Sequence, residues 1–156
     1  IMTPFSVMKI ASEDISIKDF YNNNPNLSFS RIPIYSTKMD NITGYVLKDN
    51  ILEQIVKKNG DLNLSYIKRK SIFSNYESLI PKTFDKLIKE REHISMVIDE
   101  HGTVRGLVTM EDIIETLLGR EIMDETDTVK DMQALARSKD QKNINWSIDV
   151  KDMCIV

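Results

Sequence analysis

The chain repeats one pattern of apolar and polar positions. Two extended apolar segments joined by a short polar turn precede an amphipathic segment, first over residues 32–56 and again over residues 95–118. Each half has one glycine in its second extended segment, Gly44 and Gly106, which are 62 positions apart. The pattern predicts a strand, a hairpin turn, a strand and a helix in each half.

Further elements are predicted before each hairpin. Helices are expected over Ser16–Asn23 and Thr83–Glu92, and short strands before them at Ser6–Ile10 and Ser71–Ser74. A helical bridge near Asn59–Lys70 joins the halves. One half of ~60 residues is too small to bury a good core alone. The expected fold is therefore α/β (α+β), with two pseudo-symmetric β-α-β-β-α units packed sheet to sheet.

The pattern divides the chain into three parts. Unit 1 is residues 1–60, and unit 2, with the bridge, is residues 61–122. Residues 123–156 form an acidic linker and tail, in which one more helix is expected over 128–138. The polar end from residue 140 has little apolar periodicity, so we expect it to pack loosely.

Composition narrows the function classes. The chain has 156 residues, 21 basic and 24 acidic, so no global basic field favours nucleic acid. Its single cysteine, Cys154, excludes a disulfide framework. No apolar run approaches the roughly 18 residues that cross a bilayer, and no signal peptide is visible. Because the chain opens without Met, we expect a piece of a longer protein. No catalytic residues and no metal ligands are predicted.

The sharpest local motif is the segment that begins at Gly106. Thr109 and Asp112 have the spacing of a capping box, and Gly119 suits the end of the helix that follows. A helix N-terminus also suits a phosphate, and a carboxylate there can accept hydrogen bonds from ribose hydroxyls. Capping alone and capping with ligand binding both remain open from the motif itself. Gly102 is expected to take a positive φ in the second hairpin turn.

The repeat and four segments together resemble a tandem CBS-domain pair (a Bateman module). The resemblance is closest to the CorC/CNNM, haemolysin-C-like family of membrane-associated transport proteins, and it covers about residues 1–128. The segments are Ile1–Pro4, Ser30–Tyr35, Val97–Gly102 and Gly106–Gly119. The acidic residues 124–127 also look like the family's segment after the second unit.

The resemblance implies a regulatory module and not an enzyme. It implies a homodimer on the cytoplasmic face of the cell membrane, attached to an N-terminal transmembrane domain for ion transport, of the Mg/Co efflux type. The implied ligand is an adenine nucleotide, AMP or ATP with Mg²⁺, in the cleft between the units. The rival function is a constitutive dimerisation module without ligand, and a third is an enzyme fragment whose catalytic residues lie elsewhere.

The resemblance also implies a set of ligand residues. Thr3 and Phe29 would lie near the adenine, Arg31 near the phosphates, and Thr109 and Asp112 on the ribose. An aromatic face suits a purine, and a guanidinium pairs with phosphate oxygens in a fork. From the residues alone, Phe29 as a core residue and Arg31 as a surface charge remain open.

Unit 1 departs from the pattern. Leu47 stands where unit 2 has Thr109, and Asn50 where it has Asp112. Asp49 would replace Asn50 if the helix start shifted by one residue. We therefore expect one nucleotide site per chain. The homodimer is expected to form through the helices that carry Ile51, Leu52, Ile55, Ile113, Ile114, Leu117 and Leu118.

Overall fold

The computed structural model of the chain describes residues 1–119. The acidic linker and tail predicted over residues 123–156 lie outside the described residues, as do the helix predicted over 128–138 and the loosely packed end from 140.

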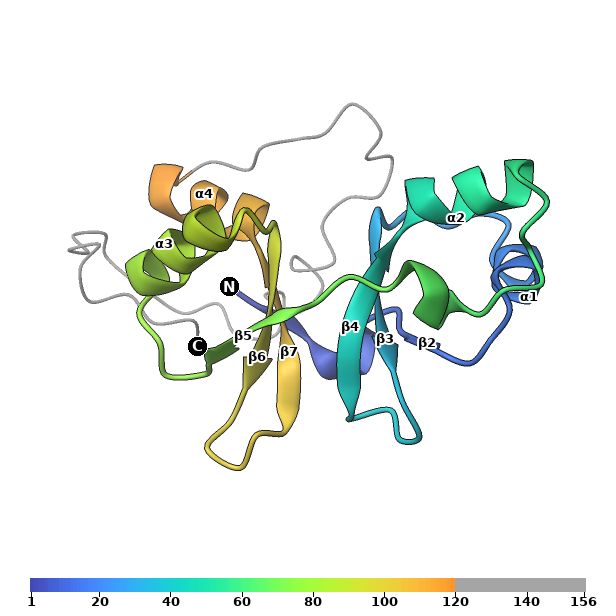
Figure 1. The fold of residues 1–156 in the computed structure, drawn as a ribbon. Helices are drawn as coiled ribbons and strands as arrows, with labels where there is room; N and C mark the ends of the chain where they lie inside the picture. Colours follow the sequence, from blue (N-terminus) through green and yellow to red (C-terminus); the bar gives the residue numbers. More distant parts are fainter. Residues whose placement is uncertain (120–156) are drawn as a thin grey trace.

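Two β-α-β-β-α units stand side by side (Figure 1). The elements of unit 1 are β2 (Ala11–Ser12), α1 (Ile17–Asn23), β3 (Arg31–Tyr35), β4 (Ile42–Leu47) and α2 (Lys48–Val56). The elements of unit 2 are β5 (Ile72–Asn75), α3 (Ile80–Glu90), β6 (Ile94–Ile98), β7 (Val104–Thr109) and α4 (Met110–Leu118). A short strand, β1 (Thr3–Pro4), and two 3-10 helices, η1 (Phe5–Val7) and η2 (Leu64–Ile67), complete the described part.

The two sheets have matching topologies. Each sheet consists of an antiparallel hairpin and one further strand, which pairs in parallel with the first strand of the hairpin. These parallel pairs are β2 with β3 and β5 with β6. Both hairpins have a register shift at the same point, between Ile34 and Tyr35 and between Val97 and Ile98. Gly102 has φ 78° in its turn and Gly119 has φ 61° after α4, as predicted. The predicted pseudo-symmetric pair is confirmed.

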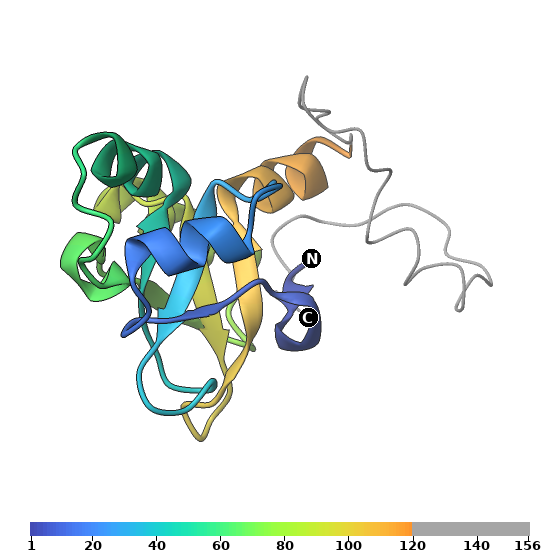
Figure 2. The ribbon, with the colours of Figure 1, turned by 90° about the vertical axis from the view of Figure 1, so that its right-hand side faces the viewer.

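Apolar side chains form three cores in layers. One lies between α1, α2 and the sheet of unit 1, and a second lies between α3, α4 and the sheet of unit 2. The third joins the two sheets, and its buried members are Ile42, Tyr45, Ile94, Met96 and Val104. Figure 2, turned so that unit 1 faces the viewer, shows α1 lying across its sheet. The sheets therefore pack face to face, as predicted.

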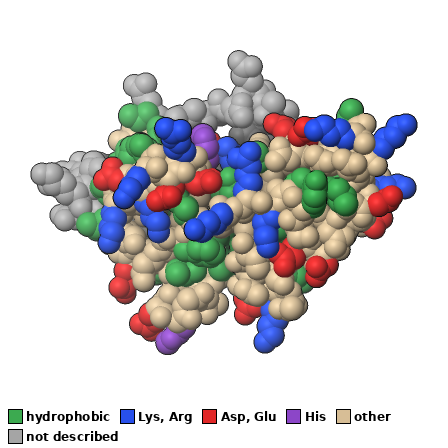
Figure 3. Space-filling model, in the orientation of Figure 1, with side chains coloured by type: hydrophobic (Ala, Val, Ile, Leu, Met, Phe, Trp, Pro, Cys, Tyr) green, Lys and Arg blue, Asp and Glu red, His purple; other side chains and the backbone are tan. Residues whose placement is uncertain are grey.

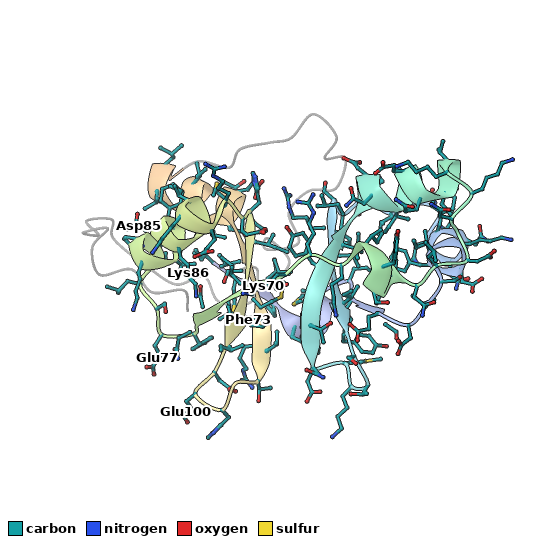
Figure 4. All side chains as sticks on the ribbon, viewed as in Figure 1. Lys70, Phe73, Glu77, Asp85, Lys86 and Glu100 are labelled. Atoms are coloured by element: carbon teal, nitrogen blue, oxygen red, sulfur yellow. The ribbon has the colours of Figure 1, made fainter. Side chains whose placement is uncertain are left out.

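Each sheet is extended by the segment that precedes the other unit. β1, at the start of unit 1, pairs with β7 of unit 2 and sets Pro4 opposite Gly106. The segment before β5 pairs with β4 of unit 1, where Tyr45 and Arg69 exchange backbone hydrogen bonds of 3.0 and 2.8 Å. Lys70, labelled in Figure 4, follows on this crossing segment. The units are thus joined by backbone pairing as well as by the core between the sheets.

Three predicted elements differ from the structure. Residues 6–10 are not a strand, because η1 turns the chain after Pro4 and allows Met8 and Ile10 to pack on the core between the sheets. The predicted bridge helix is only the four-residue η2, because residue 69 is extended and pairs with β4. Helix α3 begins at Ile80 rather than Thr83, since a proline in the first turn is preset for helix.

Unit 2 has a further link from helix to sheet. The Lys86 ammonium of α3 donates a hydrogen bond to the Phe73 backbone carbonyl of β5, and both residues are labelled in Figure 4. A second polar contact lies beneath the helix, where the buried hydroxyls of Ser74 and Ser95 are 2.9 Å apart. The Lys86 bond ties α3 to β5, and the Ser74–Ser95 contact joins β5 to β6.

Glu13 fastens the crossing segment to unit 1. Its Oε2 accepts hydrogen bonds from the Lys68 ammonium at 2.7 Å and from the Thr43 hydroxyl at 2.6 Å. The hydrogen bond from Lys68 is the main cause that lowers the pKa of Glu13 from 4.5 to about 2. Ionised Glu13 therefore stabilises the fold above pH 4.5, and this contribution is lost as the pH falls toward 2.

Lys68→Met is expected to move the pKa of Glu13 back toward 4.5, because the strongest hydrogen bond to its ionised form is removed. An NMR titration of the side-chain carboxyl measures this directly. Lys57→Met is the matched control, since it removes a lysine whose exposed ion pair with Glu53 has a similar length, 2.6 Å, but lies at the end of α2. A Glu13 pKa that stays near 2 in Lys68→Met would contradict the assignment.

Candidate functional site

The start of α4 is closed by a reciprocal cap. The Asp112 N–H donates to Thr109 Oγ1 at 3.0 Å, and the Thr109 N–H donates to Asp112 Oδ2 at 2.9 Å. The Met110 N–H, at the first position of the helix, donates to the His93 carbonyl at 2.8 Å. The predicted capping box is confirmed, and it fixes the helix start against the amino end of β6.

The Asp112 carboxyl lies half-buried at this helix start. Burial raises its pKa above the usual 3.8, while its hydrogen bonds with Thr109 act in the opposite direction. A half-buried carboxylate beside a helix N-terminus gains from neutral hydroxyl donors, because they solvate its charge where water does not reach. The two hydroxyls of a ribose are donors of that kind.

Thr109→Ala is expected to lower the free energy of unfolding by about 1 kcal/mol, because the Asp112 N–H loses its acceptor. Urea unfolding at neutral pH measures the change. Thr103→Ala, at an exposed hairpin position, is the control and should stay within about 0.5 kcal/mol. A loss for Thr109→Ala no larger than the control's would show that the cap contributes nothing to stability.

Thr3 lies beside the strand that leads to this cap. β1 sets Thr3 opposite Leu107 in β7, two positions before Thr109. The carbonyl of Thr3 approaches Gly106 so closely that a Cβ at that glycine would overlap it. The structure therefore brings three of the predicted site residues, Thr3, Thr109 and Asp112, to adjacent positions on β1, β7 and α4.

Phe29 and Arg31 come from unit 1. Arg31 is the first residue of β3, is half-buried and stands opposite Leu47. The Phe29 side chain is 49% exposed, so it is not a core residue. It borders an open groove whose other lining residues are Lys9, Asn24, Pro25, Asn26, Leu27 and Ser28.

The pseudo-symmetry relates the surroundings of these residues. The Lys48 N–H, at the start of α2, donates to the Ser30 carbonyl at 2.9 Å, as Met110 does to His93. Residue 30 therefore corresponds to residue 93, and Phe29 corresponds to Glu92. Glu92 reaches across to the other unit, where its Oε2 accepts a hydrogen bond of 2.6 Å from the Tyr45 hydroxyl. Phe29, by contrast, borders a groove that is lined by residues of unit 1 alone.

The corresponding helix start in unit 1 has no such cap. Leu47 is the N-cap residue of α2 and supplies no side-chain hydrogen bond. The helix begins at Lys48, so Asn50 aligns with Asp112 and the alternative in which Asp49 takes that place is excluded. The departure of unit 1 from the pattern is thus present in the structure as well as in the sequence.

Sequence reasoning missed three polar residues where the units meet. Tyr45 is buried, with 2% exposure, and burial raises the pKa of its hydroxyl above the usual 10.0; the hydrogen bond to Glu92 adds to this. The Arg69 side chain acts in the opposite direction and lowers this pKa. An alignment of the two halves of the sequence that matches residue 30 with residue 93 also matches Phe29 with Glu92. That alignment would have identified Glu92 as a candidate site residue.

The surface between the units carries charges of both signs. Figure 3 shows Lys and Arg side chains along the seam between the two halves, with Asp and Glu interspersed. Within residues 1–119, no group of three or more His, Cys, Asp or Glu could hold a metal ion. No helix in that range is long and apolar enough to span a membrane.

Comparisons with known proteins agree with this architecture. Residues 67–119 match the family model described as CBS domain. A UPF0053 protein of Synechocystis sp. is 30% identical over 141 residues, covering 90% of this chain and 40% of that protein. A haemolysin C homologue of Rickettsia massiliae is 38% identical over 99 residues, covering 63% of this chain and 32% of that protein. The chain thus spans less than half the length of these relatives.

Solved structures give the same result. The CBS domain of the bacterial CNNM/CorC family Mg²⁺ transporter, solved in complex with ATP, superposes with a TM-score of 0.72 at 26% identity. The match covers 77% of this chain and 85% of that one.

Proposed function

The chain belongs with the CBS-domain proteins of the CNNM/CorC and haemolysin C type, and from this premise we propose that it binds an adenine nucleotide and regulates an attached membrane transport domain. CBS domains in these families are regulatory modules rather than catalytic ones. The chain has the role of a sensor, and the transport step belongs to the N-terminal transmembrane domain of the parent protein, with this module on its cytoplasmic face.

The half-buried Asp112 carboxylate in the cap of α4 carries this proposal. The ribose hydroxyls donate to Asp112, with Thr109 beside them, while Phe29 stacks on the adenine and Thr3 lines its edge. Arg31 pairs with the phosphates, and Mg²⁺ accompanies them when the nucleotide is ATP. The support is the adjacency of Thr3, Thr109 and Asp112, together with the ATP complex of the related transporter domain.

Regulation follows from a ligand that touches both units. Arg31 and Phe29 come from unit 1, whereas Thr109 and Asp112 come from unit 2. A nucleotide held by both stabilises one arrangement of the pair, and it shifts the balance only by its difference in affinity for the two arrangements. That arrangement is passed on to the transmembrane domain through the chain that joins them.

We further propose a homodimer through the helix faces. Ile51 and Ile113 are buried in their own units and do not contribute, contrary to their place in the predicted interface. Val56 at 82% exposure and Leu118 at 63% remain available on α2 and α4. Sedimentation at about tens of micromolar should give a dimer, and Val56→Asp with Leu118→Asp should shift it toward monomer. A wild-type chain that is only monomeric would contradict the dimer.

Calorimetric titration with ATP and with AMP, each with and without Mg²⁺, tests the nucleotide proposal. One nucleotide per chain, with micromolar to submillimolar affinity, is the expected result. An intact dimer that gives no heat with either nucleotide would favour the constitutive dimerisation module instead.

A further inference from the structure

The cleft that is pseudo-symmetric to the proposed nucleotide site has a different set of side chains. Backbone pairing and register relate each predicted ligand position to its counterpart. For Thr3, Phe29, Arg31, Thr109 and Asp112 in turn, the counterparts are Arg69, Glu92, Ile94, Leu47 and Asn50. An apolar side chain replaces the predicted phosphate partner, and no counterpart retains the chemistry of the residue it replaces.

Two of the residues around this second cleft bond to each other across it. The Tyr45 hydroxyl donates to Glu92 Oε2 at 2.6 Å, which joins β4 of unit 1 to the turn before β6 of unit 2. The Arg69 side chain acts to lower the pKa of this hydroxyl, so charges of both signs act on Tyr45. Tyr45 is 2% exposed, whereas its counterpart Leu107 is only half-buried.

The two clefts therefore differ in accessibility. On the side of the proposed nucleotide site, Phe29 is 49% exposed, and the groove that it borders is lined by residues of unit 1 alone. At the second cleft, the corresponding Glu92 is half-buried and hydrogen-bonded to the opposite unit. The Phe29 ring is thus exposed, whereas its counterpart Glu92 already bonds to the opposite unit.

We propose that the Tyr45–Glu92 hydrogen bond closes the second cleft, so that Tyr45 and Glu92 are the residues that limit the chain to one nucleotide. This inference rests on the proposed function. The Tyr45 ring packs in the core between the sheets together with Leu47, at the position from which a ligand would reach α2. The negative charge of the Glu92 carboxylate repels the phosphates of an entering nucleotide. A nucleotide that displaces Glu92 also leaves the Tyr45 hydroxyl without its hydrogen-bond acceptor.

A set of variants separates the missing ligand groups from the closure. Leu47→Thr with Asn50→Asp supplies the hydroxyl and the carboxylate but keeps the Tyr45–Glu92 bond. Adding Tyr45→Leu and Glu92→Phe then removes the closing hydrogen bond and supplies an aromatic side chain, while Arg69 and Ile94 are left unchanged. Calorimetry with ATP should find one site per chain in the wild type and in the double variant, and two in the fourfold variant. Two sites in the double variant, or one in a folded fourfold variant, would overturn the proposal.

A second measurement needs no nucleotide and fewer changes. Leu47→Cys, in a Cys154→Ser background, places a thiol in the second cleft, and its rate of reaction with a small maleimide reports access. Glu92→Ala should raise that rate at least roughly tenfold, the lower end of what a hydrogen bond to a charged group controls. Thr43→Val is the control, because it removes another 2.6 Å bond from β4, to Glu13, away from Glu92.

The two measurements distinguish the failure of this inference from that of the proposed function. An unchanged labelling rate in Glu92→Ala overturns the closure, whatever the chain binds. A wild-type chain that takes no ATP overturns the nucleotide proposal and the limit to one nucleotide with it, while an accelerated rate in Glu92→Ala still identifies the bond that closes the cleft.

Discussion

Gly106→Ala is expected to lower the free energy of unfolding by about 3 kcal/mol or more, at the upper end of what overpacking costs. A Cβ at this position would lie less than 3.0 Å from the Thr3 carbonyl oxygen. Thr3 belongs to β1, whose backbone is paired with β7, so it can retreat only by giving up that pairing. Thermal unfolding should show a decrease of roughly 6–12 °C in Tm.

Gly44 provides an independent test of the same effect. Its missing Cβ would meet the Arg69 carbonyl, on the segment that pairs with β4, so Gly44→Ala should cost a similar amount. Gly60→Ala is the control, because its added Cβ would meet no backbone oxygen and its nearest neighbour, the Lys18 Cβ, would be 3.0 Å away, a much milder contact. If both strand substitutions melted like Gly60→Ala, the close crossing of β1 and of the segment around Arg69 would be wrong.

Asp112→Ala should weaken nucleotide binding by roughly 10- to 150-fold. A hydrogen bond to a charged group contributes about 1.5–3 kcal/mol, and this range converts to that change in affinity. Stability should fall by about 1 kcal/mol or less, because only part of the cap is lost and Thr109 still accepts the N–H of residue 112. Calorimetry with ATP measures the first effect and urea unfolding the second.

Asp112→Asn separates ligand binding from capping. The amide oxygen can still accept the Thr109 N–H, which the carboxylate accepts at 2.9 Å, but the charge is gone. If Asp112 holds the ribose, the Asp112→Asn variant should bind ATP clearly more weakly than the wild type, with a Tm close to the wild-type value. If both Asp112 variants bound ATP with wild-type affinity, Asp112 would be only a capping residue and not a ligand of the nucleotide.

The sequence predicted the elements whose signals are local. The hairpins, the capping box of Thr109 and the helix end at Gly119 depend on residues a few positions apart, and they are present in the structure. The face-to-face sheets also followed, because two small units with apolar faces have few other ways to bury them. For the site, Thr109, Asp112 and Thr3 were predicted, and the structure brings them to neighbouring positions.

The missed features depend on contacts between distant segments. Residues 6–10 read as a strand, yet backbone pairing of Thr3 with unit 2 imposes a turn there. The segment through Arg69 was predicted as part of a helix, but it is extended and pairs with β4. The Tyr45–Glu92 bond spans 47 positions, and local patterning carries no information on which buried tyrosine meets which carboxylate.

Photolabelling with an azido-adenine analogue of ATP tests most directly where the nucleotide binds. After labelling, digestion and mass spectrometry identify the peptide that carries the adenine. A base that lies against Phe29 predicts label on residues 24–31, reduced by excess ATP and nearly absent in Asp112→Ala. ATP-protected label on residues 89–94, around Glu92, or label on 24–31 that excess ATP does not reduce, would contradict a single nucleotide site between the two units.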